Sequence, residues 1–273
     1  MSRLLSKTLI LLTILSINIL YCQAKEPQEI KDLKPIFDKY NVNGSILVFD
    51  CNNGEYKGFN IERCNQGFSP ASTFKIPNTL IALETKTVTT DSVFKWNGEK
   101  QDLPAWETDM NIAQAYKASC VPIYQSIAKS IGVEQMKKYI RLFHFGNMII
   151  NQDNINRFWL EQESKITQFQ QIYFLKRLYN LELPISNQTM LTMKQIMLQE
   201  DMNSYKLYAK TGLDVSGEIT HGWYVGYIET KNNVYFFATN IEPKEKIIPE
   251  KFNLSRIELT KDVLAYLGAI PSN

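Results

Sequence analysis

The stretch Ser69-Pro70-Ala71-Ser72-Thr73-Phe74-Lys75-Ile76-Pro77 decides how this chain is interpreted. Proline lacks a backbone N–H and is tolerated in a helix only near its first turn, so Pro77 predicts a helix that begins close to Thr73. Ser72 then lies near the N-cap, where free N–H groups and the helix dipole can stabilise a negative charge. Lys75 follows one turn later and faces it. The pair indicates a nucleophile and its base, although an ordinary capping serine explains Ser72 equally well on these residues alone.

The Ser-x-x-Lys spacing alone does not select this pair. It occurs three times, beginning at Ser72, Ser92 and Ser126. Both residue types are common, so chance matches are expected in a chain of this length. The other two pairs lack a helix start bracketed by prolines, and local geometry therefore favours Ser72.

Composition indicates a globular chain with an exported N-terminus. The 273 residues are 44% hydrophobic and 21% charged, which suits one or two domains with a real core. Residues 1–24 combine a basic start, an apolar run and a small residue at Ala24, which predicts a secretory signal cleaved after Ala24 and a periplasmic protein. A lipoprotein signal at Cys22 is disfavoured by the bulky Tyr21. A retained membrane anchor is a further alternative, but the apolar run is short for a span.

Charge argues against polyanionic partners. Residues 1–24 hold two of the 30 basic residues and none of the 28 acidic ones, so the remainder has no net formal charge. This balance favours neither nucleic acid nor an anionic membrane surface as a partner. We expect a monomer or a homodimer.

Three cysteines remain beyond the signal, at positions 51, 64 and 120. Cys51 and Cys64 flank an Asn-Gly turn, so a disulfide between them is one possibility in an exported protein. Cys120 is then unpaired and is expected to be buried. His144 and His221 lack metal-like spacing to the cysteines, so we predict no metal site.

Periodicity predicts one sheet built from both ends of the chain. The expected helices are 29–40, 123–131, 135–142, 167–179, 184–200 and 254–267, and the expected strands are 45–49, 55–61, 205–210, 220–229 and 234–240. This order indicates an α+β fold with an antiparallel sheet flanked by N- and C-terminal helices and a mostly helical insertion. We expect a single domain, 25–273, whose α/β part is about 25–87 and 201–273 and whose helical part is about 88–200.

Four further stretches carry polar groups that suit a catalytic site. Lys210-Thr211-Gly212 ends a predicted strand and offers a charge, a hydroxyl and a closely approachable backbone. Ser119 could relay a proton, and Arg256 could bind a carboxylate. Trp159 is expected in the core, where its N–H needs a partner. Each has an ordinary explanation by itself: a strand-end turn, a helix cap, a surface arginine and a core tryptophan.

The ordered set resembles the class D serine β-lactamases, the oxacillinases. The resemblance rests on Ser72-x-x-Lys75, Ser119-x-Val121, Phe145-Gly146-Asn147, Trp159-Leu160, Lys210-Thr211-Gly212, Lys95-Trp96-Asn97-Gly98 and Gly222-Trp223-Tyr224-Val225-Gly226-Tyr227. It runs from about Gly44 to about Leu267. Each motif is weak, but their order is specific. The implied fold is the penicillin-binding/β-lactamase-like transpeptidase fold.

The resemblance implies a role for each site residue. Ser72 resembles the nucleophile that attacks the β-lactam carbonyl, and Lys75 resembles the lysine that CO₂ carboxylates. By the same resemblance, Trp159 holds that carbamate and Ser119 passes a proton to the leaving nitrogen. Lys210, Thr211 and Gly212 are implied to line the strand side of the site. The resemblance further implies that the N–H groups of Ser72 and Leu213 form the oxyanion hole and that Arg256 binds the substrate carboxylate. No other cofactor is implied.

The chain departs from the family pattern at two positions. Phe145 replaces a common tyrosine, and Leu213 stands where an aromatic residue is frequent. Substrate spectrum is expected to depend on the loops near Trp106, Leu213 and Val215.

The carbamate has a physical rationale in the chemistry of lysine. Only about one lysine in 2,500 is neutral at pH 7 with an ordinary pKa near 10.4. An apolar pocket from Phe74, Ile76 and Trp159 would lower the pKa of Lys75 and favour the neutral amine that reacts with CO₂. Carboxylation then makes an anionic general base, which can activate Ser72 for acylation and water for deacylation.

Three functions remain in view. The first is hydrolysis of penicillins through an acyl-enzyme. The second is a β-lactam sensor that is acylated without turnover; sensors of this type usually carry several membrane spans before the domain. The third is a peptidoglycan D,D-peptidase, which the contexts of Trp159 and Ser119 disfavour.

Overall fold

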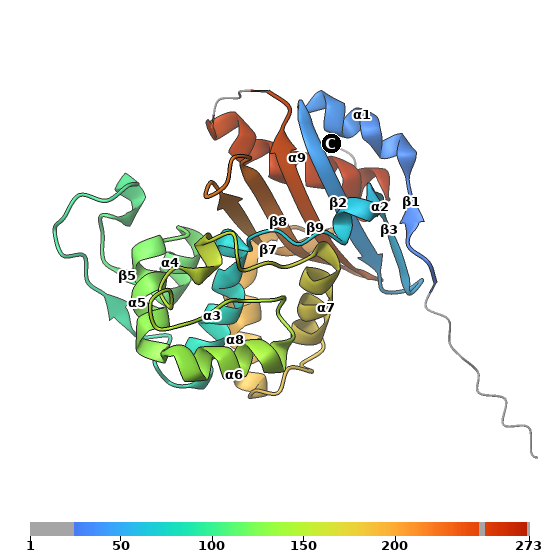
Figure 1. The fold of residues 1–273 in the computed structure, drawn as a ribbon. Coiled ribbons are helices and arrows are strands. Elements are labelled where there is room, and N and C mark those ends of the chain that lie inside the picture. Colours follow the sequence, from blue (N-terminus) through green and yellow to red (C-terminus); the bar gives the residue numbers. More distant parts are fainter. Residues whose placement is uncertain (1–24, 246–248, 272–273) are drawn as a thin grey trace, which may run out of the picture.

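The computed structural model describes residues 25–245 and 249–271. Their strands form a seven-stranded sheet in the order β1-β3-β2-β9-β8-β7-β6 (Figure 1). The strands are β1 (Gln28–Glu29), β2 (Val42–Asp50), β3 (Glu55–Phe59), β6 (Leu198–Asp201), β7 (Tyr205–Asp214), β8 (His221–Thr230) and β9 (Val234–Pro243). Every pair is antiparallel except β1 with β3. The sheet therefore joins N- and C-terminal segments, as the sequence predicts.

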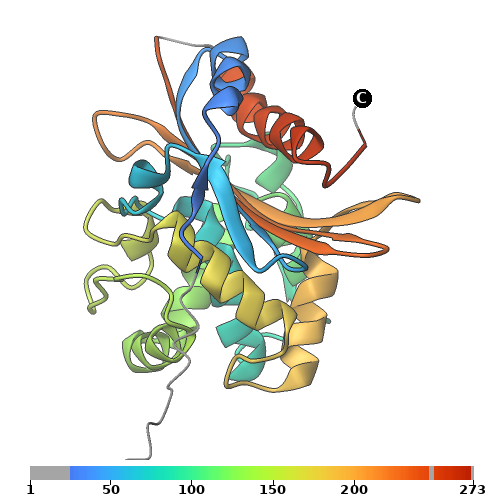
Figure 2. The same ribbon diagram turned by 90° about the vertical axis from the view of Figure 1, so that its right-hand side faces the viewer.

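Helices cover both faces of the sheet. The helices are α1 (Lys34–Lys39), α2 (Ile61–Cys64), α3 (Lys75–Glu84), α4 (Ile112–Lys117), α5 (Val121–Ile131), α6 (Val133–Phe143), α7 (Gln168–Tyr179), α8 (Asn187–Met197) and α9 (Pro249–Tyr266). Short 3₁₀ turns are η1 (Lys31–Leu33), η2 (Ala71–Phe74), η3 (Pro104–Trp106) and η4 (Phe158–Leu160), and a small ribbon pairs β4 (Val93–Phe94) with β5 (Met110–Asn111). In Figure 2, α1 and α9 lie on one side of the sheet, and α7 and α8 on the other.

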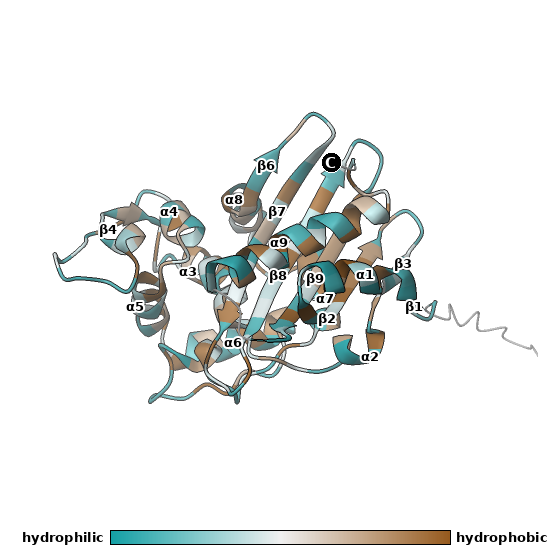
Figure 3. Cartoon of the chain, turned by 90° about the horizontal axis from the view of Figure 1, so that it is seen from above, coloured by the Kyte–Doolittle hydropathy of each residue, from teal (hydrophilic) through white to brown (hydrophobic). Residues whose placement is uncertain are grey.

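Alternation along the central strands creates two separate cores. Ile46 and Val48 of β2 face α1 and α9, whereas Leu47 between them faces the helical block, which is residues 71–197 with α3 to α8. Successive side chains of a strand point to opposite faces, so a run of apolar residues serves both cores. Figure 3 views the α1 and α9 face, where these helices cross hydrophobic strand residues. No described helix is long and apolar enough to cross a membrane.

Several expectations about local structure are wrong. The helix predicted over 29–40 covers only Lys34–Lys39 and follows a short strand at Gln28–Glu29, and the strand predicted over 205–210 continues to Asp214. The α-helix does not begin near Thr73 with Ser72 as its N-cap: a 3₁₀ turn spans Ala71–Phe74, and α3 starts at Lys75. The helix predicted over 184–200 is shorter, because the Ser186 hydroxyl accepts the N–H of Thr189 and starts it at Asn187. The last helix begins earlier than predicted, at Pro249. The predicted signal, 1–24, lies outside the described residues.

The possible disulfide between Cys51 and Cys64 is absent, and the described cysteines are free. The β2–β3 hairpin explains this. Asp50 pairs with Glu55 beside the turn that holds Cys51, whereas Cys64 follows the far end of β3 in α2. Those ends are separated by at least four residues of strand, or ~13 Å, which is too far for a disulfide. Cys120 is buried, as expected.

Gly44 lies where β2 and β9 approach closely at the centre of the sheet, and its substitution tests that close approach. Its φ is +140°, and a Cβ there would lie 2.3 Å from the Asn240 carbonyl oxygen. We expect Gly44→Ala to lower the free energy of unfolding by ~3 kcal/mol or more. Gly54→Ala is the matched control, because Gly54 also has a positive φ but has no atom within 4 Å of the added Cβ; it should cost about 1 kcal/mol. Urea unfolding compares them, and equal losses would contradict the steric argument.

Candidate active site

Ser72 sits in a strained turn at the start of α3. Ala71, the residue before it, is buried and has a φ of +47°, a conformation that costs a non-glycine residue energy. The turn is held by Thr73, whose N–H and hydroxyl both donate to the Pro70 carbonyl, at 3.1 and 2.7 Å. The Gln171 amide of α7 donates to the Thr73 hydroxyl at 2.8 Å. This bracing fixes where the Ser72 hydroxyl points.

Lys75 lies directly behind Ser72. Its Nζ is 2.8 Å from the Ser72 Oγ, and its side chain is fully buried. Burial lowers the pKa of Lys75 to about 7, because the ammonium loses its hydration. Around pH 7 a large share of the lysine is therefore a neutral amine, in contact with the Ser72 hydroxyl, which it could deprotonate.

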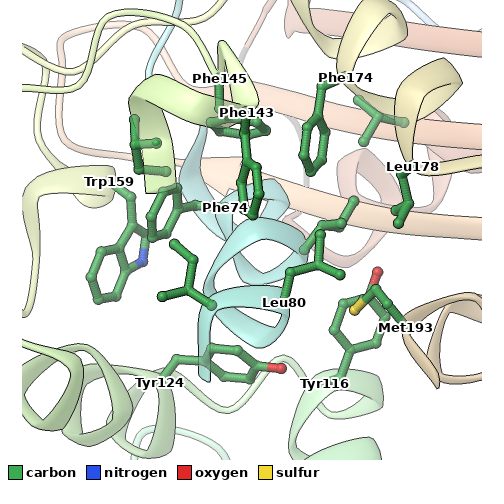
Figure 4. Packing of buried hydrophobic residues seen from close by; sticks show 14 of the residues in the cluster. Phe74, Leu80, Tyr116, Tyr124, Phe143, Phe145, Trp159, Phe174, Leu178 and Met193 are labelled. Atoms are coloured by element: carbon green, nitrogen blue, oxygen red, sulfur yellow. The ribbon is translucent and has the colours of Figure 1, made fainter. Parts of the chain in front are cut away.

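An aromatic wall surrounds Lys75. The Tyr124 ring centroid is 5.1 Å from Nζ, and the Tyr124 hydroxyl shares a 2.7 Å hydrogen bond with Thr79. Phe74 stacks on Trp159 with centroids 5.3 Å apart, and Figure 4 shows the two rings side by side. Trp159 is fully buried, yet its Nε1–H has no hydrogen-bond partner among the described residues. Such an orphan donor is costly unless something binds it.

Ser119 and Lys210 form a second pair. Lys210 Nζ donates to the Ser119 Oγ at 3.0 Å and to the Thr211 carbonyl at 3.0 Å. Ser119 has a φ of +53° in the turn between α4 and α5. Burial, and then the charge of Lys75, hold the pKa of Lys210 well below its usual range. The Ser119 hydroxyl is thus positioned by an amine that can exchange protons.

Glycine lets strand β7 approach the Ser72 turn. A Cβ on Gly212 would lie 3.2 Å from the Pro70 carbonyl oxygen and 3.2 Å from Thr73 Cγ2. Arg256 of α9 reaches the same strand, because its Nη1 donates to the Gly212 carbonyl at 2.5 Å. Burial lowers the pKa of Arg256 to about 10, so its guanidinium stays charged at neutral pH. Its Nε has no partner among the described residues.

A cavity of about 530 Å³ collects these groups. Ser72, Ser119, Thr211, Gly212, Leu213 and Arg256 line it, together with Asp102, Leu103, Trp106, Val121, Leu160, Asp214, Val215, Ser216 and Asn253. Lys75, Lys210 and Trp159 do not line it, but each lysine is one hydrogen bond behind a serine that does. The structure therefore brings the sequence-predicted residues together from separate segments. Hydroxyls face the cavity and amines lie behind them.

Sequence reasoning missed the link between two loops at the cavity mouth. Gln162 Nε2 donates to Asp214 Oδ2 and to Ser216 Oγ, both at 2.8 Å. Asp214 is buried and also accepts the N–H and hydroxyl of Ser216. These residues belong to no local pattern, so only the fold reveals their contact.

Comparison with known proteins agrees with this geometry. The family model "Penicillin binding protein transpeptidase domain" matches residues 34–258. The chain is 39% identical over 252 residues to β-lactamase OXA-48 of Klebsiella pneumoniae, covering 91% of this chain and 92% of that protein. It is 43% identical to the crystal structure of the class D β-lactamase YbXI from Nostoc, with a TM-score of 0.82, covering 86% of this chain and 98% of that one.

A relative with a different role also matches. The regulatory protein BlaR1 of Bacillus licheniformis is 30% identical over 248 residues, which cover 89% of this chain but 40% of that protein. The chain belongs to the class D β-lactamases, within the penicillin-binding protein transpeptidase domain family.

Replacing Lys75 tests whether the site is built at the expense of stability. We expect Lys75→Met to raise the free energy of unfolding by roughly 1–4 kcal/mol at pH 7, because a buried cation is replaced by an apolar chain of similar size. The gain should be full below about pH 6, where the lysine is protonated in both states, and should shrink from about pH 7 toward 10.5, where the folded lysine is neutral and the unfolded one is still protonated. Urea unfolding in CO₂-free buffer at several pH values measures this. A variant less stable than the parent at pH 7 would contradict it.

Proposed function

We propose that this protein is a serine β-lactamase that hydrolyses the cyclic amide of penicillin-type antibiotics through an acyl-enzyme on Ser72. The observation that carries the proposal is the 2.8 Å contact between the Ser72 Oγ and the fully buried Lys75 Nζ. A serine hydroxyl is a weak nucleophile until a base accepts its proton. The similarity to proteins named β-lactamases supports the same reaction class.

Acylation begins with attack of the Ser72 Oγ on the β-lactam carbonyl while the Lys75 side chain accepts the proton of the Ser72 hydroxyl. The N–H groups of Ser72 and Leu213 stabilise the oxyanion, which is the largest single contribution in many acyl transfers. Arg256 binds the substrate carboxylate with its remaining donors. Ser119 passes a proton to the departing nitrogen, and Lys210 holds Ser119 in place at 3.0 Å. The C–N bond of the ring breaks and an ester on Ser72 remains.

We also propose that Lys75 works as a carbamate. The neutral amine attacks CO₂ and releases a proton, and the resulting carbamate anion then serves as the general base. Two observations support this proposal. Burial keeps much of Lys75 neutral. The Trp159 ring stacks on Phe74, and its Nε1–H, which has no hydrogen-bond partner among the described residues, is free to donate to an anion. Water is then activated on the same side of the ester for deacylation. We further propose a periplasmic location, following the exported N-terminus expected from 1–24.

The alternative is a β-lactam sensor that is acylated and does not turn over. The similarity to BlaR1, a protein named as regulatory, is the observation behind this alternative. Both functions need Ser72, so only the fate of the ester separates them.

Multiple turnover is the first test. We expect penicillin to be hydrolysed well beyond one equivalent of protein, measured by loss of the β-lactam absorbance and by mass spectrometry of the protein. Ser72→Ala should form no adduct, whereas Ser92→Ala, which carries another Ser-x-x-Lys serine, should match the parent. A stoichiometric burst with a stable adduct on Ser72 would support the sensor instead.

Bicarbonate dependence is the second test. Acid exposure should remove CO₂ from Lys75, and activity at pH 7.5 should return on adding bicarbonate. Without bicarbonate, activity should fall as pH drops below about 7, because protonation removes the neutral amine.

Trp159→Phe keeps the stacking on Phe74 but removes the N–H, so we expect kcat to fall roughly 10²-fold and the bicarbonate requirement to rise. Trp96→Phe is the control, since Trp96 is exposed and its N–H already donates to the Glu99 carbonyl. Normal kcat and unaltered bicarbonate dependence in Trp159→Phe would exclude the assigned role.

A further inference from the structure

A separate cavity lies behind Trp106. Its volume is about 290 Å³, near the lower end of small-molecule sites, which span roughly 300–1,000 Å³. The chain between β4 and β5, which projects beyond α5 in Figure 1, supplies most of the lining. Trp106 lines both this cavity and the active-site cavity, so it lies between the two. Neither Ser72 nor any other residue assigned to catalysis lines the separate cavity, which therefore has no part in the proposed reaction.

Two indole rings in fixed orientations form walls of this cavity. The Trp96 Nε1–H donates to the Glu99 carbonyl at 2.8 Å, and the Trp106 Nε1–H donates to the Ala118 carbonyl at 3.0 Å. Because both polar edges are already paired, the rings offer a ligand their apolar faces. Trp96 is 39% exposed, and Phe94 adds a third ring to the lining. Covering these faces with the apolar side of a ligand would remove them from water, which is favourable.

Two side-chain amides are organised around the same backbone unit as Trp96. The Asn97 Oδ1 accepts the Glu99 N–H, and the Gln101 NH₂ donates to the Glu99 carbonyl, both at 3.1 Å. Both amides line the cavity, and these bonds leave the Asn97 NH₂ as a donor and the Gln101 Oε1 as an acceptor. A neighbouring donor and acceptor match an acetamido group, whose carbonyl accepts and whose N–H donates.

The charge of the lining favours an uncharged ligand. Among the described residues that line the cavity, Lys95 is the only charged one, and its Nζ lies 2.6 Å from Asp109 Oδ2. The same carboxylate accepts the backbone N–H of Trp96 at 3.0 Å, so the ion pair belongs to the structure of the loop. Little net charge is therefore left to attract an ion.

We propose that this cavity binds the ring of a neutral N-acetylhexosamine. One face of a hexopyranose in the β-gluco configuration carries mainly C–H groups and lies against an indole ring. The acetamido group pairs with Asn97 and Gln101. The hydroxyls of Thr108 and Ser126, which are exposed in the lining, are available to the ring hydroxyls. Such a ring occurs as a free sugar and at the end of glycan chains.

Two matched sugars test the site. Methyl N-acetyl-β-D-glucosaminide and methyl β-D-glucoside differ only in carrying an acetamido or a hydroxyl group at C2. Their binding is followed by the tryptophan indole N–H resonances of the protein in a ¹H–¹⁵N NMR spectrum. We expect the acetamido sugar to shift the resonances of Trp96 and Trp106 but not those of the fully buried Trp159 and Trp223. Its Kd should be roughly fivefold lower than that of the glucoside, which lacks the acetamido hydrogen bonds.

The same titration can overturn the proposal. A shift of Trp106 without a shift of Trp96 would place the sugar in the active-site cavity, because Trp106 lines both cavities and Trp96 lines only the separate one. An absence of saturable shifts, or equal Kd values for the two sugars, would also overturn it.

Variants of the lining assign the contacts. Trp96→Ala should raise the Kd of both sugars roughly tenfold, followed through Trp106, because a stacking face is lost. Gln101→Ala should weaken the acetamido sugar to the level of the glucoside. Tyr266→Ala is the matched control, since Tyr266 is 52% exposed on α9 and does not line the cavity; both Kd values should equal those of the parent. Unchanged binding in Trp96→Ala would overturn the site.

Chitotetraose, titrated in parallel, distinguishes the two sources of the ring. A chain end as the ligand requires chitotetraose to bind at least as tightly as the methyl glycoside. Weaker binding of chitotetraose assigns the site to the free sugar, because the neighbouring rings of a chain would then be excluded.

Discussion

The hydrogen bond between Lys75 and Ser72 is the contact on which the rest of the structure depends. It is useful only if water is kept from the amine, and the helical block supplies that exclusion with Tyr124, Phe74 and Trp159. A buried, weakly partnered amine is destabilising by several kcal/mol in principle, since its charged form is poorly solvated. The large apolar core behind α3 offsets that cost. The positive φ of Ala71 is a further energetic cost, and such backbone strain persists only where the surrounding residues are well packed.

The other half of the site depends on the sheet. Strand β7 delivers Lys210 to Ser119, and its Gly212 passes close enough to the Ser72 turn to form one wall of the cavity. Arg256 is tied to the same strand through the Gly212 carbonyl. Both faces of the sheet thus contribute: the helical block carries the serines, and α9 on the opposite face carries the arginine. Neither core could be removed without loss of the site.

Much of this was predictable, because the motifs are local. Ser72 with Lys75 and the strand that carries Lys210 follow from spacing, proline placement and β-branched runs, although that strand continues to Asp214 and does not end at Lys210. The N-cap assignment of Ser72 failed because the sequence does not distinguish a 3₁₀ turn from the first α-helical turn. The disulfide failed because spacing in sequence does not give the length of a hairpin between two cysteines. The contact of Gln162 with Asp214 joins segments far apart in the chain, and a single sequence contains no signal for it.

The pairing of β2 with β9 determines when, during synthesis of the chain, the sheet can form. Ile46 of β2 lies opposite Thr239 of β9, so the centre of the sheet closes only when nearly the whole polypeptide is available. Contacts between such distant residues form slowly, because loop closure must precede them. Ser72 and Lys75 emerge early in synthesis, but the strand and helix that complete their cavity emerge last. A partly synthesised chain therefore has the Ser72–Lys75 pair without the pocket, and the cavity is complete only once the C-terminal helix is in place.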